Sequence, residues 1–195
     1  MKLDRSFYLR DDVVKLARDL LGKYLFTAID GILTGGYITE VEAYAGTSDR
    51  ASHAWEDRRT ARTEVMYHEG GVAYVYLCYG IHSLFNIVTN REGIPHAILV
   101  RGIYPTHGMD SILKRSGKPS MTPAISDGPG KVSKILGINT RHTGTDLLSS
   151  TIWLEDRQWI ISEDDIEITK RIGIDYAGVD AQRPYRFVLK QKTPV

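Results

Sequence analysis

The sequence predicts an α+β fold: a single domain with a curled, mainly antiparallel sheet, surrounding helices and a protruding β-hairpin. Three observations favour this class. Strand-like runs follow one another through short hairpin turns rather than through helices. The strand–helix alternation of a doubly wound fold is missing, and so is a glycine-rich dinucleotide loop. The length of 195 residues suits one domain, which we expect to extend over residues 1–195.

The first half of the chain predicts one helix and two hairpins. Asp11 can cap a helix whose apolar residues recur at helical spacing, and Gly22 ends that helix. Asp30-Gly31 between two β-type runs is a hairpin signal, and Gly80 interrupts a second pair of such runs. The expected elements are a helix over 13–21, strands over 24–29 and 32–44, a loop with a short helix over 45–70, and strands over 72–79 and 84–89.

The second half of the chain predicts strands, short helices and one long loop. Pro95 precedes a strand-like run, while proline and glycine crowd the segment 116–129 and favour a loop there. Gly137 ends a short helix. The expected elements are strands over 96–104, 151–154 and 185–189 and helices over 110–115 and 131–136.

Composition and charge are typical of a soluble globular protein. The single Cys78 excludes an intramolecular disulfide and a cysteine-rich zinc site. No run is apolar enough for a signal peptide or for a membrane span of roughly 18 residues, so we expect a cytoplasmic protein, associated with the nucleoid if it is bacterial. The net charge of +1 does not by itself indicate a nucleic-acid binder, and a solvated mixed-charge surface would explain the basic clusters. These clusters are Arg50, Arg58, Arg59 and Arg62; Lys114, Arg115 and Lys118; and Lys131, Lys134 and Arg141.

One predicted strand brings two carboxylates and a tyrosine together. Successive side chains of a strand alternate between its faces, so Glu40, Glu42 and Tyr44 share one face. Carboxylates beside a tyrosine near a strand end are suited to line a pocket. A solvent-facing edge of the sheet would show the same pattern, and the pattern alone leaves both interpretations open.

Tyrosine is concentrated in the second predicted hairpin. Tyr74 and Tyr76 share one face of the strand, and Tyr79 falls at the hairpin corner beside Gly80. The eleven tyrosines of the chain offer flat apolar faces with polar tips, which suit a surface that binds flat, partly polar ligands. A large aromatic residue at a hairpin tip is either a plug of the core or a projecting wedge, and the sequence leaves both open.

Several short blocks, taken together and in order, identify a family resemblance. They are Glu40-Val41-Glu42-Ala43-Tyr44, His53, Tyr74-Val75-Tyr76 through Tyr79-Gly80, Asn86, Leu99-Val100-Arg101, Asp127-Gly128-Pro129-Gly130-Lys131 and Arg183-Pro184-Tyr185-Arg186-Phe187. In these blocks the chain closely resembles the alkyladenine (3-methyladenine) DNA glycosylase family, the single-domain type without a helix-hairpin-helix. The resemblance extends from about residue 10 to about residue 190 without large gaps.

The resemblance implies a monofunctional DNA glycosylase that flips alkylated purines, such as 3-methyladenine, out of duplex DNA and hydrolyses the N-glycosidic bond to start base excision repair. It implies that Glu42 is the general base that activates the attacking water, held by Arg101 and the main-chain carbonyl of Ile172. A nearby carboxylate both stabilises an oxocarbenium-like transition state and accepts the proton of water. No lysine matches a family nucleophile, so we expect no Schiff base and no strand cleavage.

The resemblance also implies a pocket for the extruded base. Tyr44, His53 and Tyr76 resemble its walls, with His53 hydrogen-bonding the base. Asn86 takes the position that reads the purine edge, where a guanine 2-amino group would clash. Stacking on aromatic faces is worth about 1–3 kcal/mol per contact, and a cationic alkylpurine adds cation–π attraction.

Three further residues are expected to contact the duplex. Tyr79 matches the side chain that fills the gap left by the flipped nucleotide, and Met66 matches another residue that lies against DNA. Lys131 follows a predicted helix start whose free amides can hold a phosphate. The expected partner is double-stranded DNA with damaged bases, bound by a monomer without a cofactor. The six histidines lack metal-binding spacing, so we expect no metal.

The segment 128–134 allows a second interpretation. With Asp146 downstream, it is superficially similar to the helix-hairpin-helix glycosylases, which pair a Pro-Gly turn and a lysine with a catalytic aspartate. The β-rich surroundings favour a helix start instead, with Asp127 as its N-cap rather than a catalyst.

Two other classes of function compete with the glycosylase. A non-catalytic nucleic-acid-binding module would use the same tyrosine surface but would need no Glu42–Arg101 pair. A small-molecule hydrolase on a related fold would need neither Tyr79 nor the arginine clusters. His82 makes the stretch after the hairpin corner more polar than the family often shows, which bears on the range of substrates.

Overall fold

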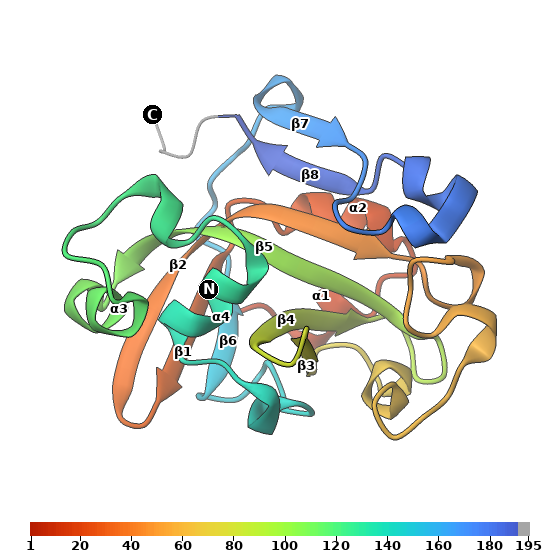
Figure 1. The fold of residues 1–195 in the computed structure, drawn as a ribbon, viewed down its shortest axis with the longest axis horizontal. Coiled ribbons are helices and arrows are strands. Elements are labelled where there is room, and N and C mark those ends of the chain that lie inside the picture. Colours follow the sequence, from red (N-terminus) through yellow and green to blue (C-terminus); the bar gives the residue numbers. More distant parts are fainter. Residues whose placement is uncertain (191–195) are drawn as a thin grey trace.

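A computed structural model describes residues 1–190 and confirms the α+β fold, with one curled antiparallel sheet and a few short helices (Figure 1). The described strands are β1 (Tyr24–Ile29), β2 (Ile32–Tyr44), β3 (Ala73–Cys78), β4 (His82–Thr89), β5 (His96–His107), β6 (Ile152–Glu155), β7 (Ile166–Thr169) and β8 (Arg186–Leu189). The α-helices are α1 (Arg5–Tyr8), α2 (Val13–Asp19), α3 (Met109–Ser116) and α4 (Pro129–Leu136). Short 3-10 helices cover Gly46–Ser48, Trp55–Asp57, Glu64–Tyr67, Pro123–Ile125, Thr140–His142, Glu163–Asp165 and Asp175–Gln182.

Strand β2 is the spine of the sheet. The main path runs β3-β4-β5-β2-β1-β6, and every pair in it is antiparallel. Along one edge, β2 pairs first with β1, over residues 32–37, and then with β8, over residues 40–42. Strand β7 continues this branch beyond β8. The sheet therefore divides along β2, and the second branch holds the C-terminal strands beside residues 40–42.

Both predicted hairpins are confirmed, and both turn through a pair of residues with positive φ. The β1–β2 turn uses Asp30 (φ 54°) and Gly31 (φ 74°). The β3–β4 turn uses Tyr79 (φ 51°) and Gly80 (φ 72°), and the amide of Ile81 donates a hydrogen bond of 3.1 Å to the carbonyl of Cys78. Positive φ at both central residues is the requirement of a type I′ turn, whose twist matches the flanking strands.

The structure corrects the predicted ends of two helices. Asp12, not Asp11, caps α2, because its side chain is the one that reaches the amide of Lys15, at 2.8 Å. Helix α4 starts at Pro129, two residues earlier than predicted, since proline needs no amide donor at the first helical position. Its N-cap is the backbone of Gly128, so the predicted capping role of Asp127 is wrong.

Helix α1 and strand β7 were not among the predicted elements, because both have only four residues and no distinctive pattern. Residues 191–195 of the predicted domain lie outside the described chain. None of the helices in residues 1–190 has the length and hydropathy needed to cross a bilayer.

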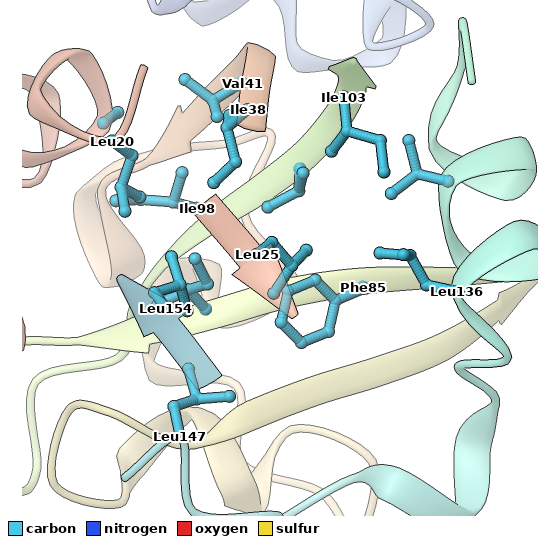
Figure 2. Close-up of a cluster of buried hydrophobic side chains, with 14 of the residues drawn as sticks. Leu20, Leu25, Ile38, Val41, Phe85, Ile98, Ile103, Leu136, Leu147 and Leu154 are labelled. Atoms are coloured by element: carbon cyan, nitrogen blue, oxygen red, sulfur yellow. The ribbon is translucent and has the colours of Figure 1, made fainter. Parts of the chain in front are cut away.

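The main core lies on the face of the sheet that α2 and α4 cover. Leu25 and Phe85 from the sheet meet Leu136 of α4 in its interior, and Val41 and Ile98 come from the central strands (Figure 2). Ile38 and Ala43 of β2 also belong to this core, whereas Glu40, Glu42 and Tyr44 lie on the opposite face of the strand. That opposite face carries the residues of the candidate site.

Candidate active site

An irregularity in the pairing of β2 with β5 brings a guanidinium between two carboxylates. The register shifts on both sides of Glu40, and it leaves Thr39 and Arg101 without an opposite residue in the ladder. Such β-bulges redirect side chains. As a result, Arg101 Nε lies 2.8 Å from Glu40 Oε1 and 3.4 Å from Glu42 Oε1.

Glu42 is fully buried, with 0% of its surface exposed, and its carboxylate is held by three neighbours. Oε2 accepts a hydrogen bond from the Tyr44 hydroxyl at 2.8 Å, and Oε1 accepts one from the Ile172 amide at 2.8 Å. Burial raises the pKa of Glu42, and the charge of Arg101 and these hydrogen bonds offset only part of that effect. The carboxyl therefore sits closer to its protonated form than an exposed glutamate does.

Glu40 differs from Glu42 although the two share a strand face. Its Oε1 accepts from Arg101 Nε at 2.8 Å and from Arg186 Nε at 2.7 Å. Burial raises the pKa of Glu40, but the hydrogen bonds from Arg186 and Arg101 outweigh it, and the net pKa is below the ordinary value. Two carboxylates with pKa values pushed in opposite directions take different roles. Glu42 is the one prepared to accept a proton, and both are buried, so the solvent-edge interpretation is wrong.

A buried ion pair fixes the segment that supplies the Ile172 amide. The side chains of Arg171 and Asp49 are both fully buried, with Nη2 and Oδ1 2.8 Å apart. Arg171 also donates to the carbonyl of Ala43 at 2.9 Å, and its guanidinium lies 4.8 Å from the centre of the Tyr44 ring. This pair ties the loops around residues 46–57 to the segment 171–182, which lie at the same end of the sheet (right side of Figure 1).

The opposite face of the sheet opens into a cavity of about 470 Å³, which we call the central cavity. This volume is within the range of ~300–1,000 Å³ usual for small-molecule sites. Glu42 does not line the cavity itself, but all three residues that hold its carboxylate do. The predicted residues that line the central cavity are Tyr44, His53, Met66, Tyr76, Tyr79, Asn86, Arg101 and Ile172.

His53 and Tyr76 form one aromatic wall of the central cavity. Their rings meet edge to face with centroids 4.6 Å apart, and His53 Nδ1 lies 2.8 Å from the Tyr74 hydroxyl. Burial lowers the pKa of His53 to about 4, with help from the positive charges of Arg62 and Arg58. The imidazole is therefore neutral at pH 7. Tyr74 was not predicted as a site residue, although its place in the tyrosine-rich strand could have indicated it.

Asn86 forms a rigid part of the same wall. It is buried on β4, and its Nδ2 donates to the carbonyl of Tyr74 at 3.1 Å and to that of Leu84 at 3.2 Å. These two bonds fix the plane of the amide. The orientation of Asn86 is thus determined by the β3–β4 hairpin and not by a ligand.

Tyr79 projects from the tip of the hairpin with 92% of its surface exposed. The interpretation as a core plug is therefore wrong. Leu77 and Ile81 are also exposed beside it, so the tip is apolar as a whole. A left-handed backbone at a residue with a Cβ costs roughly 1–2 kcal/mol, and an exposed tyrosine regains none of that by packing. A tyrosine held in this way indicates a surface that meets a partner.

Met66 and Lys131 differ in their exposure, and Tyr79 of the hairpin tip shares a cavity with each of them. Met66 is only 2% exposed, packed within a small core cluster at the cavity wall. The expected contact of Met66 with DNA stays a prediction, and its 3-10 helix turns the side chain inward to the central cavity that it lines. Lys131 is exposed in the first turn of α4 and lines a second cavity, of about 540 Å³, on the other flank of the hairpin with Lys118 and Lys134.

Removal of one partner of the buried Arg171–Asp49 pair tests its structural role. Asp49→Ala is expected to lower the free energy of unfolding by about 3–5 kcal/mol, because it leaves a buried guanidinium without its counter-charge. Urea denaturation followed by circular dichroism measures this change. In Arg141→Ala, which removes an exposed ion pair with Asp30, the loss should stay below about 1 kcal/mol. Equal losses in both variants would show that the buried Arg171–Asp49 pair does not fix the segment that supplies the Ile172 amide.

The comparisons with known proteins agree with the predicted resemblance. The family model for Methylpurine-DNA glycosylase (MPG) matches residues 6–193. A protein of Chlamydia felis is 43% identical over 193 residues, covering 97% of each chain. A protein of Bacillus thuringiensis is 41% identical over 195 residues, covering 96% of this chain and 95% of its own. Both are named "Putative 3-methyladenine DNA glycosylase". The chain therefore belongs to the methylpurine-DNA glycosylase family, hydrolases that act on N-glycosyl bonds and have DNA as their substrate.

Proposed function

We propose that the chain, acting as a monomer and as one glycosylase domain over 1–195, extrudes an alkylated purine from duplex DNA into the central cavity and hydrolyses its N-glycosidic bond. The observation that carries this proposal is the environment of Glu42. A buried carboxylate with a raised pKa, held directly behind the wall of a tyrosine-lined cavity, is suited to general-base chemistry on a ligand in that cavity.

The proposed reaction uses one water molecule and one base. Glu42 takes a proton from the water, and the resulting hydroxyl attacks C1′ of the deoxyribose. The C1′–N bond breaks, its electron pair goes to the purine, and a cationic alkylpurine leaves as a neutral base. Arg101 and the main-chain carbonyl of Ile172 hold the water, while the negative charge of Glu42 stabilises the oxocarbenium-like transition state. No lysine nucleophile takes part, so the DNA strand stays intact.

The walls of the central cavity support a purine as the bound group. Tyr44 and Tyr76 offer aromatic faces on which a flat base stacks. The neutral state of His53 at pH 7 removes a charge that would repel a cationic base and leaves the ring available for a hydrogen bond with it. Asn86 contributes a rigid amide to the cavity wall, and we assign it the discrimination between adenine- and guanine-derived bases through a clash with the 2-amino group of guanine.

The apolar hairpin tip supports duplex DNA as the partner. Extrusion of a base costs a few kcal/mol, and an aromatic side chain that fills the vacated stack offsets part of that cost. Tyr79 is placed for this role at the mouth of the central cavity, which it also lines. Lys131, in the first turn of α4 on the other flank of the hairpin, is placed to hold a backbone phosphate.

The two competing functions explain less of the structure. A non-catalytic binding module has no use for a fully buried Glu42 held by Arg101, because burying a carboxylate costs stability. A small-molecule hydrolase has no use for a strained, exposed Tyr79. The glycosylase accounts for both features at once.

Glu42→Gln tests the catalytic step. The amide keeps the shape of the side chain but cannot accept the proton of water, so single-turnover release of the alkylated base should fall by about 10²–10⁴-fold while binding of the lesion duplex persists. Release is measured by chromatography of free bases from an alkylated duplex in EDTA, and binding by gel shift. Glu167→Gln, an exposed change on β7 with the same chemistry, is the control. Release near the wild-type rate in Glu42→Gln would reject the general-base role.

Tyr79→Ala tests the wedge. Loss of one stacked ring, worth about 1–3 kcal/mol, should weaken extrusion about tenfold or more. The fluorescence of 2-aminopurine placed next to the lesion reports the loss of stacking. Ile160→Ala is the matched control, because Ile160 is as exposed as Tyr79 and lies outside the hairpin and the cavities described above. A flipping signal in Tyr79→Ala equal to that of the control would contradict the wedge.

A further inference from the structure

The side chain of Arg62 lies across the aromatic wall of the central cavity. Its Nη2 is 3.0 Å from His53 Nε2 and 3.3 Å from His53 Nδ1, and its guanidinium carbon lies 5.0 Å from the centre of the Tyr76 ring. Arg62 is thus a planar cation on a tyrosine face with a hydrogen bond to His53. A cationic alkylpurine in this cavity would make the same two contacts. Arg62 and a cationic base therefore cannot contact His53 and Tyr76 at the same time.

A third cavity adjoins the central cavity, and Arg62 lines both. This arginine cavity has a volume of about 480 Å³, and Arg50, Arg58 and Arg62 are among its lining residues. Within residues 1–190, no carboxylate lies within ion-pair distance of these three guanidinium groups. The nearby Asp180 carboxylate is engaged by the Arg50 amide at 2.9 Å and by Arg183 at 2.8 Å.

Three guanidinium groups without a carboxylate partner surround one cavity, and they favour an anion with several oxygen acceptors. Arginine presents a planar fork of donors that matches phosphate geometry. The two cavities share four lining residues, Ser52, His53, Arg62 and Tyr176. An anion in the arginine cavity could therefore belong to the same nucleotide as a base in the central cavity. The phosphodiester of an extruded nucleotide meets this description.

We propose that Arg62 occupies the base position in the free protein and, when a base enters, leaves it to bind the adjoining phosphodiester in the arginine cavity with Arg50 and Arg58. This inference rests on the proposed function, because it takes the central cavity as the base site. One consequence is a threshold. Every base must displace the guanidinium first. The apparent affinity for the base is therefore the intrinsic affinity multiplied by the fraction of the protein in which Arg62 has left the base position.

Arg62→Gln separates the two roles of Arg62, because they act on binding in opposite directions. The first probe is the 3,9-dimethyladeninium ion, a cationic alkylpurine without sugar or phosphate. It should bind Arg62→Gln about three- to tenfold more tightly than wild type, as the competing cation is gone, measured by quenching of protein fluorescence. The second probe is lesion duplex DNA. It should bind Arg62→Gln more weakly, with the slope of log K against log salt reduced by about 1.

Two neighbouring arginines provide matched controls with the same loss of charge. Arg58→Gln, which lines only the arginine cavity, should weaken DNA binding and leave the affinity for the dimethyladeninium ion unchanged. Arg59→Gln, whose side chain pairs with Glu64 outside both cavities, should change neither.

An affinity of Arg62→Gln for the dimethyladeninium ion equal to or below that of wild type, including no binding by either protein, overturns the inference. Unchanged DNA binding in Arg62→Gln overturns the phosphate part of it. Release of alkylated bases by the wild-type protein is measured alongside. Its absence would refute the proposed function itself, whereas an active enzyme with an unaltered Arg62→Gln variant refutes only the exchange.

Discussion

Arg101 is shared unequally between two buried carboxylates, and the chemistry of the site depends on that sharing. The bulged ladder between β2 and β5 places its Nε closer to Glu40 than to Glu42, by 2.8 Å against 3.4 Å. Glu40 gains a second guanidinium from Arg186 and stays ionised. Glu42 is buried in the same region with only the more distant Arg101 guanidinium beside it, so burial raises its pKa. A regular ladder would not place one arginine beside both acids.

The rest of the site is held by connections between distant parts of the chain. The division of the sheet along β2 brings β8, and with it Arg186, beside residues 40–42. The buried pair of Arg171 and Asp49 then locks the segment that presents the Ile172 amide to Glu42. The environment of Glu42 thus depends on residues more than a hundred positions away, so the fold must be complete before the site exists.

Local signals predicted much of the fold. The Asp30-Gly31 turn and the β-forming runs on either side gave strands over 24–29 and 32–44, and the structure has the same bounds. The predicted cap of α2 was wrong by one residue. Asp11 and Asp12 are adjacent and equally suited to cap a helix, and only the folded structure shows that Asp12 accepts the hydrogen bond from the Lys15 amide. Alternation along β2 correctly grouped Glu40, Glu42 and Tyr44, because strand geometry has a period of two even beside a bulge.

The sequence could not predict what depends on long-range contacts. Asp49 and Arg171 carry no local pattern, and their burial as a pair follows only from the folded chain. The burial of Met66 follows from the inward turn of a short 3-10 helix, which no periodicity marks. Tyr79 left two interpretations open because its exposure depends on whether other segments cover the hairpin tip. The family resemblance named candidate residues around the central cavity, but it did not indicate that Arg62 lies across the wall formed by His53 and Tyr76.

The most direct test of the account is the pH dependence of single-turnover base release from a duplex with a cationic alkylpurine, at saturating protein. If ionised Glu42 removes the proton of water, the rate rises as the pH increases through the pKa of Glu42 and reaches a plateau above that pKa. Burial places that midpoint above 4.5, the ordinary value for glutamic acid. A rate that is independent of pH through this range, or one that falls as the pH rises, would contradict the central role of the buried carboxylate.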